Sequence, residues 1–177
     1  VGGGIYVDGK LISGFMGAGG EIGHMKLVKD GKLCGCGQKG CFEAYASATG
    51  LIREATSRLI VNKQNLLYTM IEGKLDTLEA KDIFDAAKEG DKFSLDLVDY
   101  EAEYLAMGIG NILNIINPEI IIFTGGVARA GEIITDGVKK YLPKYALGMT
   151  MENLIFTFGK LEEEAGIKGA AALVMNK

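Results

Sequence analysis

The feature that most constrains this chain is a group of soft metal ligands close to its beginning. The 177-residue sequence has one histidine and three cysteines, and all of them lie between positions 24 and 41: His24, Cys34, Cys36 and Cys41. Three thiolates and one imidazole complete the tetrahedral shell of a zinc ion, and a shell of four protein ligands is typical of structural zinc. The sequence therefore predicts a loop held by zinc.

The surroundings of the cysteines favour this interpretation. Gly35, Gly37 and Gly40 lie between or beside them and allow the positive φ angles that a tight knuckle needs. The alternative is that the cysteines are reduced core residues and that the histidine is an ordinary surface residue. The stretch is too polar for a core, and an odd number of cysteines argues against a disulfide framework.

Composition narrows the class of protein. Hydrophobic residues make up 48% of the chain, which suits a globular fold, and no stretch approaches the roughly 20 apolar residues of a membrane span. The net charge is −4 and the pI is about 5.1, without a basic run, so nucleic acid is not expected as the main partner. Reduced cysteines and the lack of a recognisable targeting segment predict a cytoplasmic protein.

The start of the chain predicts a larger parent protein. Val1 is not an initiator methionine, and residues 1–4 read as the end of a glycine-rich turn. A length of 177 residues suits one domain or one lobe of an enzyme. We find no internal repeat and no linker that would divide the chain.

The first half of the chain mixes short strands and helices. Residues 5–7 and 11–12 around Asp8-Gly9 predict a β-hairpin. Residues 22–28 read as a strand, and a helix is expected from Phe42. Ser47 or Thr49 can cap the next helix, which has apolar residues at helical spacing.

The second half predicts helices around a buried strand. A helix over 94–116 has one apolar stripe and ends before Pro118, because the residue preceding proline avoids the helical region. The β-branched run at 120–123 is typical of a strand buried on both faces. The other expected elements are helices at 81–89, 131–141 and 165–175 and a strand at 154–158, with 62–74 left open. This order predicts an α/β domain with a mixed sheet and flanking helices.

Two glycine motifs and two acids are candidate ligand-binding features. Gly125-Gly126 follows the strand at 120–123, where open α/β sheets bind ligands, although a simple chain reversal explains the pair equally well. The amides of residues 2–4 could cradle a phosphate. Glu21 and Glu43 flank the cysteine loop, so they are either solvated surface acids or carboxylates that the metal keeps oriented.

Five segments together resemble one known family. They are residues 1–5, 20–25, 34–47, 117–127 and 166–172. They are similar to the signature of the ROK family (repressor, open reading frame, kinase). The resemblance covers nearly the whole chain and implies that 1–177 is the C-terminal lobe of an ATP-dependent sugar kinase with the actin-like, ribonuclease-H-like fold. The N-terminal lobe would be absent from this chain.

The resemblance also implies roles for single residues, within a sugar- and zinc-binding loop at 20–47. The residues that would bind sugar hydroxyls are Glu21, His24 and Glu43. Those that would hold zinc are His24, Cys34, Cys36 and Cys41. Those that would line the ATP site are Gly2, Gly3, Gly125 and Gly126. One nitrogen of His24 would bind the metal and the other would face the sugar.

No catalytic residue is expected in this chain. In the family the catalytic base is the aspartate of an Asn-Asp pair, and the phosphate loop reads Asp-x-Gly-x-Thr; neither motif occurs here. Phosphoryl transfer needs such a base and a magnesium ion. We therefore expect 1–177 to be inactive alone and its parent to phosphorylate a sugar with ATP and Mg²⁺.

Three functions remain open at this point. The first is a hexose kinase, glucokinase-like, that acts on glucose, fructose or an N-acetylhexosamine. The second is a sugar-responsive repressor of the same family, in which a helix-turn-helix precedes the sugar domain. The third is a zinc-stapled structural module, which leaves the placement of Glu21 and Glu43 unexplained. Family resemblance also implies a homo-oligomer, expected to be a dimer.

Overall fold

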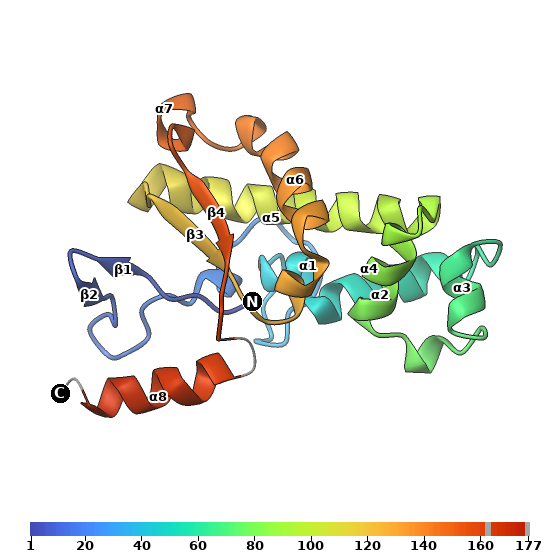
Figure 1. Ribbon diagram of the computed structural model, residues 1–177, viewed down its shortest axis with the longest axis horizontal. Helices are drawn as coiled ribbons and strands as arrows, with labels where there is room; N and C mark the ends of the chain where they lie inside the picture. Colours follow the sequence, from blue (N-terminus) through green and yellow to red (C-terminus); the bar gives the residue numbers. More distant parts are fainter. Residues whose placement is uncertain (162–163, 176–177) are drawn as a thin grey trace.

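One long helix, α5 (Lys92–Ile116), forms the centre of the molecule. A computed structural model describes residues 1–161 and 164–175 (Figure 1). Three longer helices pack against α5: α2 (Ala48–Leu59), α4 (Ala80–Lys88) and α6 (Glu132–Tyr141). The short helix α1 (Glu43–Ala46), which precedes α2, also contacts α5. The prediction of a helix over 94–116 is confirmed, with a start two residues earlier.

Local interactions determine both ends of α5. The Asp91 side chain accepts a hydrogen bond from the Ser94 amide at 3.0 Å and so caps the first turn. At the other end Asn117 adopts a left-handed conformation with φ of 47°, directly before Pro118. Asparagine tolerates this conformation better than most residues, and the proline prevents the helix from continuing.

The strands form two small sheets. In the first, β1 (Tyr6–Val7) pairs antiparallel with β2 (Lys10–Leu11), as the hairpin pattern predicts. In the second, β3 (Ile120–Phe123) pairs in parallel with β4 (Ile155–Phe158). The expected antiparallel and parallel pairings are thus both present, but as separate sheets within the described residues rather than as one mixed sheet.

Two expectations about strands are wrong. The strand β3 is not buried on both faces, since Ile120 is 43% and Ile122 is 59% exposed. Its inner face packs on the core, but no described element covers its outer face. Residues 22–28 are not a strand either: Ile22–His24 form the short helix η1, because the amide of Met25 bonds the carbonyl of Ile22 at 3.1 Å in a tight turn.

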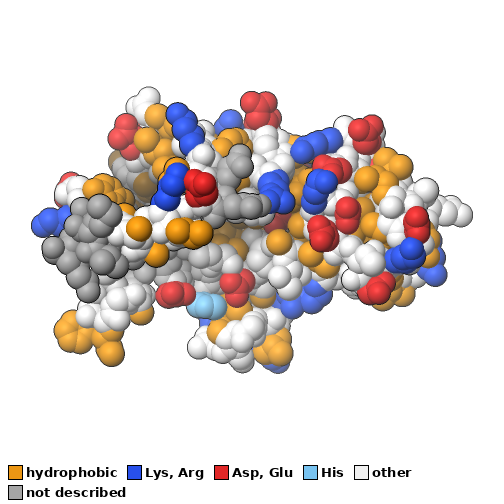
Figure 2. Space-filling model, turned by 60° about the horizontal axis from the view of Figure 1, so that its bottom comes forward, with side chains coloured by type: hydrophobic (Ala, Val, Ile, Leu, Met, Phe, Trp, Pro, Cys, Tyr) orange, Lys and Arg blue, Asp and Glu red, His pale blue; other side chains and the backbone are white. Residues whose placement is uncertain are grey.

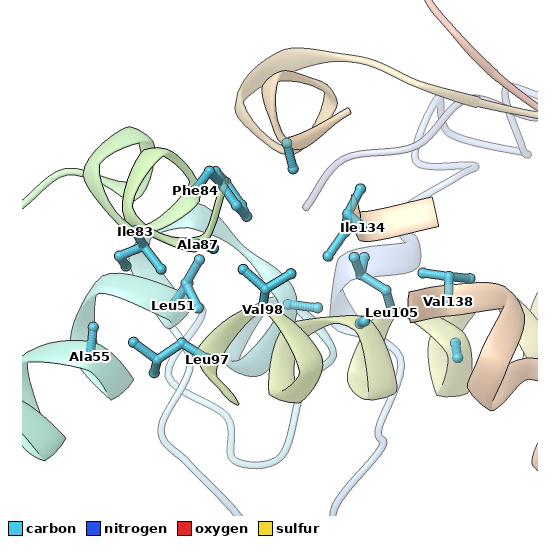
Figure 3. Packing of buried hydrophobic residues seen from close by; sticks show 14 of the residues in the cluster. Leu51, Ala55, Ile83, Phe84, Ala87, Leu97, Val98, Leu105, Ile134 and Val138 are labelled. Atoms are coloured by element: carbon cyan, nitrogen blue, oxygen red, sulfur yellow. The ribbon is translucent and has the colours of Figure 1, made fainter. Parts of the chain in front are cut away.

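The apolar core lies between α5 and the helices around it (Figure 3). Side chains from different helices interdigitate there, and most are fully buried. Those that Figure 3 labels are Leu51 and Ala55 of α2, Ile83, Phe84 and Ala87 of α4, Leu97, Val98 and Leu105 of α5, and Ile134 and Val138 of α6. Burial of apolar area at about 25 cal/mol per Å² is the main favourable term in folding, so these helices hold the domain together.

The remaining described elements are short, except for α8 with its 11 residues. They are α3 (Leu66–Met70), η2 (Leu75–Thr77), η3 (Gly125–Ala130), η4 (Leu142–Lys144), α7 (Gly148–Met151) and α8 (Ala165–Met175). Helix α8 has the expected bounds and lies apart from the packed helices in Figure 1, with Ile167 77% exposed. Among the described helices, none combines the length and the apolar character that a bilayer crossing requires.

Candidate metal centre and ligand cavities

The cysteines lie on a compact turn, which we call the knuckle (residues 31–41). The amide of Cys34 donates to the carbonyl of Gln38 at 2.8 Å, and the amide of Gly37 donates to the carbonyl of Cys34 at 3.0 Å. Gly37 has φ of +83°, a value that a side chain disfavours. An isolated bridge between Lys26 and Cys41 fixes the knuckle to the segment after His24.

The fold brings the four predicted metal ligands to one point. Their ligand atoms all lie within 4.8 Å of one another. The Sγ atoms of Cys36 and Cys41 are 3.7 Å apart, and Cys34 Sγ is 3.8 Å from His24 Nδ1. Tetrahedral zinc with Zn–S bonds of about 2.3 Å requires S···S separations of about 3.8 Å and S···N separations of about 3.6 Å. The arrangement therefore fits zinc in both ligand type and spacing.

The charge around the sulfurs also fits a cation. A backbone hydrogen bond from Cys36 lowers the pKa of Cys34, but burial and the neighbouring thiols outweigh it and raise this pKa to about 11. A backbone hydrogen bond from Gln38 lowers the pKa of Cys36. Three thiolates cannot accumulate at one point without a positive partner, and a divalent ion supplies it. Lys26 contributes further, because its Nζ donates to Cys41 Sγ at 3.1 Å.

The two predicted carboxylates lie next to this cluster. Glu21 Oε2 is 3.8 Å from His24 Nε2, the ring nitrogen that does not face the sulfurs. Glu43, the first residue of α1, has its Oε1 3.6 Å from Cys34 Sγ. The backbone nitrogen of Val1 lies 2.6 Å from Glu43 Oε2. In Figure 2 the only histidine lies at the surface between acidic side chains.

A cavity of about 430 Å³ adjoins Glu43. Its lining includes Cys34, Glu43, Ser47 and Arg53. Arg53 donates from Nη2 to the carbonyl of Ala44 at 2.6 Å, which ties α2 to the helix that carries Glu43. The volume of this cavity lies in the range of cavities that bind small molecules.

A second cavity, of about 410 Å³, lies at the carboxyl ends of β3 and β4. Gly125 and Gly126 line it, as the position of the glycine pair after the strand predicts. Gly125 has φ of +71°, so the turn after β3 requires a residue without a side chain. Gly126 also lines a neighbouring cavity of about 290 Å³ that Gly2 reaches. Gly2 and Gly126 thus line one cavity, whereas Gly3 is not among the lining residues of these cavities and packs near Ile22.

Sequence reasoning missed several residues of these sites. Lys26, beside the sulfurs, had no recognisable signal. Arg129, Phe158 and Gly159 line the cavity at the ends of β3 and β4. Gly159 could have been found, because it follows β4 as Gly125 follows β3, and parallel strands end at the same edge of a sheet.

Fold and site together define a class of protein: an actin-like α/β lobe with a Cys₃His cluster beside two carboxylates and glycine-lined cavities at the strand ends. The sequence model of the ROK family matches residues 1–177, so the chain belongs to this family. This membership confirms the resemblance and the fold class inferred from the sequence motifs.

Individual relatives cover both branches of the family. A glucokinase of Halalkalibacterium halodurans is 39% identical over 175 residues, which is 98% of this chain and 53% of the relative. The crystal structure of a ROK family glucokinase from Streptomyces griseus in complex with glucose and AMPPNP superimposes with a TM-score of 0.88 at 34% identity, covering 97% of this chain and 56% of that one. A xylose repressor of Caldicellulosiruptor bescii is 29% identical over 99% of this chain and 44% of its own length. The chain spans about half the length of the curated relatives it matches.

Proposed function

We propose that this chain is the sugar- and zinc-binding C-terminal lobe of an ATP-dependent hexose kinase, glucokinase-like, with the catalytic base in another lobe of the parent protein. The observation that carries the proposal is the orientation of His24. Its Nδ1 faces the sulfurs, while its Nε2 faces Glu21 and the surface. A metal ion on the first nitrogen would therefore fix the direction in which the second one points.

In this proposal, each residue that contacts the sugar and the zinc ion has a separate role. Glu21 and Glu43 accept hydrogen bonds from sugar hydroxyls, and His24 Nε2 makes a third polar contact. Zinc, held by His24 and the three cysteines, supplies structural rigidity and no reaction step. Because the metal orders the loop beforehand, the sugar does not have to offset the entropy of ordering the carboxylates.

The nucleotide would occupy the cavities at the ends of β3 and β4. Glycines at 2, 125 and 126 let backbone amides approach phosphate without interference from a Cβ atom. ATP would bring Mg²⁺, which balances the charge on the transferred phosphoryl group. Since the base is assigned to another lobe, we expect residues 1–177 alone to show no kinase activity. The thiolates of the cluster fit a reducing compartment, in line with the cytoplasmic expectation, and homodimer formation also stays a prediction.

The alternative is the sugar-sensing domain of a ROK repressor, and the similarity to a xylose repressor is the observation that favours it. The discriminating experiment uses the full-length protein. ATP consumption is measured against a panel of hexoses and N-acetylhexosamines, and binding of the same sugars is measured without ATP. Phosphorylation of one sugar supports the kinase; sugar binding without phosphorylation supports the repressor.

Substitution of Glu43 tests the site itself. Glu43→Ala removes a carboxylate acceptor, so we expect the KM for the sugar to rise about tenfold to a hundredfold, as for loss of a charge-assisted hydrogen bond. Zinc content, measured by elemental analysis, should stay unchanged, whereas Cys36→Ser should lose the metal. Glu89→Ala, at an exposed acid directly after α4, is the matched control. An unchanged KM in Glu43→Ala would remove this residue from the sugar site.

A further inference from the structure

A second set of contacts holds the knuckle to the helices without using any of the metal ligands. We call it the tyrosine cluster, and its members come from the knuckle, α1, α2 and α5. They are Lys32, Tyr45, Glu54, Tyr100 and Tyr104.

The hydroxyl of Tyr45 is the contact that matters most. It accepts a hydrogen bond from the backbone amide of Lys32 at 2.7 Å, and Tyr45 is 3% exposed. Lys32 precedes Cys34 by two residues, and Tyr45 follows Glu43 by two residues. One hydroxyl therefore joins the turn that carries the cysteines to the helix that carries the carboxylate. Gly31 makes this approach possible, because a Cβ atom at that position would collide with the Tyr45 hydroxyl.

The ring of Tyr45 is fixed in turn by α5. It stacks on Tyr104 with ring centroids 4.4 Å apart and an angle of 20° between the planes. Tyr104 contacts Tyr100, one turn earlier on the same helix, at a centroid distance of 4.9 Å. Aromatic pairs of this kind stabilise a structure beyond the effect of the area they bury. The hydroxyl of Tyr45 is thus attached to the rigid centre of the fold.

The charges of the cluster are balanced within it. Lys32 Nζ donates to the hydroxyl of Tyr100 at 2.7 Å and forms an ion pair with Glu54. Burial alone would raise the pKa of Glu54, but hydrogen bonds from Lys32 and Arg58 hold it below its ordinary value. Burial, and then the nearby Glu54, raises the pKa of Tyr100, so that hydroxyl keeps its proton. None of these contacts needs a metal ion.

We propose that Tyr45 is a positioning residue for the metal centre: its hydroxyl keeps the knuckle in the ligand-ready shape before zinc binds. Ordering the backbone of a flexible segment costs conformational free energy. A knuckle that is already ordered binds zinc without that cost. It also keeps Cys34 and Glu43 in a fixed position relative to each other. The proposal concerns zinc binding; only its consequence for the sugar rests on the proposed kinase function.

The test compares Tyr45→Phe with the unchanged full-length protein. Phenylalanine keeps the stacking and removes only the hydrogen bond, so zinc affinity, measured by competition with a chromophoric chelator, should fall about threefold to tenfold. Tyr68→Phe on α3 removes a hydroxyl at a distance from the knuckle and should leave the affinity unchanged.

Unfolding of the metal-free and zinc-loaded forms separates positioning from general stability. Because weaker zinc binding also lowers the stability that zinc adds, removal of this hydroxyl should cost more stability in the zinc-loaded protein than in the metal-free one. Equal losses in both forms, with unchanged zinc affinity, would overturn the proposal. If Tyr45→Phe fails to fold, Tyr104→Leu serves instead, because it removes the ring that stacks on Tyr45 and so loosens the hydroxyl. Zinc binding should then weaken about threefold, and an unchanged affinity would again overturn the proposal.

The sugar gives an independent readout. At limiting zinc, Tyr45→Phe should raise the KM for the sugar while kcat per zinc-loaded molecule stays constant, and saturating zinc should restore the KM. A KM that does not respond to zinc contradicts the positioning role. If the protein without any substitution binds zinc but phosphorylates no sugar, this result contradicts the kinase function. The zinc competition then still tests the role of Tyr45.

Discussion

At the scale of single residues, Glu101 has the most unusual environment in the described part of the chain. It lies on α5 with 0% exposure, and neither carboxylate oxygen has a hydrogen-bond partner there. Burial raises its pKa to about 8, from an ordinary 4.5. The carboxyl group is therefore protonated in the folded protein at neutral pH, because an unpaired buried charge would be far more costly.

This residue predicts how stability depends on pH. Between pH 4.5 and about 8 the folded state keeps a proton that the unfolded state has lost. Stability should therefore fall as the pH rises through this window, by up to about 1.4 kcal/mol per pH unit from this group. Urea unfolding of the unchanged protein and of Glu101→Gln, which mimics the protonated acid, checks this: the variant should lose most of the slope. Glu89→Gln, an exposed acid, should retain it. Parallel pH profiles for Glu101→Gln and the unchanged protein would contradict the assignment.

At the scale of secondary-structure elements, packing outweighs helix propensity where α5 contacts the residue that follows the knuckle. Gly108 in the middle of α5 faces Phe42, which lies between Cys41 and Glu43 in the sequence. A Cβ atom at position 108 would lie 2.5 Å from Cζ of Phe42, which is 2% exposed. Glycine at this position therefore lowers the helix propensity of α5 but allows close packing against the Phe42 ring.

The contact predicts the sign of a substitution. By propensity alone, Gly108→Ala should stabilise α5 by up to about 1 kcal/mol. We expect it instead to destabilise the protein by about 1 to 3 kcal/mol, because Phe42 cannot move away within a full core. Chemical denaturation measures the difference. Gly148→Ala, at an open position on α7, should change stability by less than about 0.5 kcal/mol. A stabilised Gly108→Ala would show that Phe42 has room to shift.

At the scale of the whole molecule, the metal centre is coupled to the main core through a small cluster of its own. Cys34, Cys41, Ala44 and Tyr45 form this cluster, and Tyr100 and Tyr104 of α5 pack against it. If this cluster holds a metal ion, a change in its occupancy should therefore reach the central helix. Such coupling makes part of the zinc-binding free energy a contribution to folding.

Removal of zinc should lower the melting temperature of the full-length protein. With free zinc at a thousandfold excess over its dissociation constant, the bound ion adds about 4 kcal/mol to the free energy of unfolding. Thermal melts with and without a chelator measure this loss. Re-addition of Zn²⁺ should restore stability and Mg²⁺ should not, because thiolates are poor ligands for a hard ion. Identical melts before and after chelation would contradict zinc binding at His24 and the cysteines.

Short-range patterns were sufficient for much of this protein. The stripe of α5, the cap at Ser47, whose side chain accepts from the Gly50 amide at 3.0 Å, and the Asp-Gly hairpin each depend on residues a few positions apart. The grouping of His24 with the three cysteines was also predictable, because their types and their spacing in the sequence are those of a zinc site. Such features need no knowledge of how distant segments meet.

Contacts between distant segments could be found only in the folded chain. The segment at 22–28 is apolar enough for a strand, yet its first three residues form the helix η1, and Lys26 pairs with Cys41 in an isolated bridge. The exposure of β3, the burial of Glu101 and the bond from Lys32 to Tyr45 likewise depend on which elements pack together. Backbone geometry alone permits several partners at each of these places, and the packing of side chains around α5 selects one.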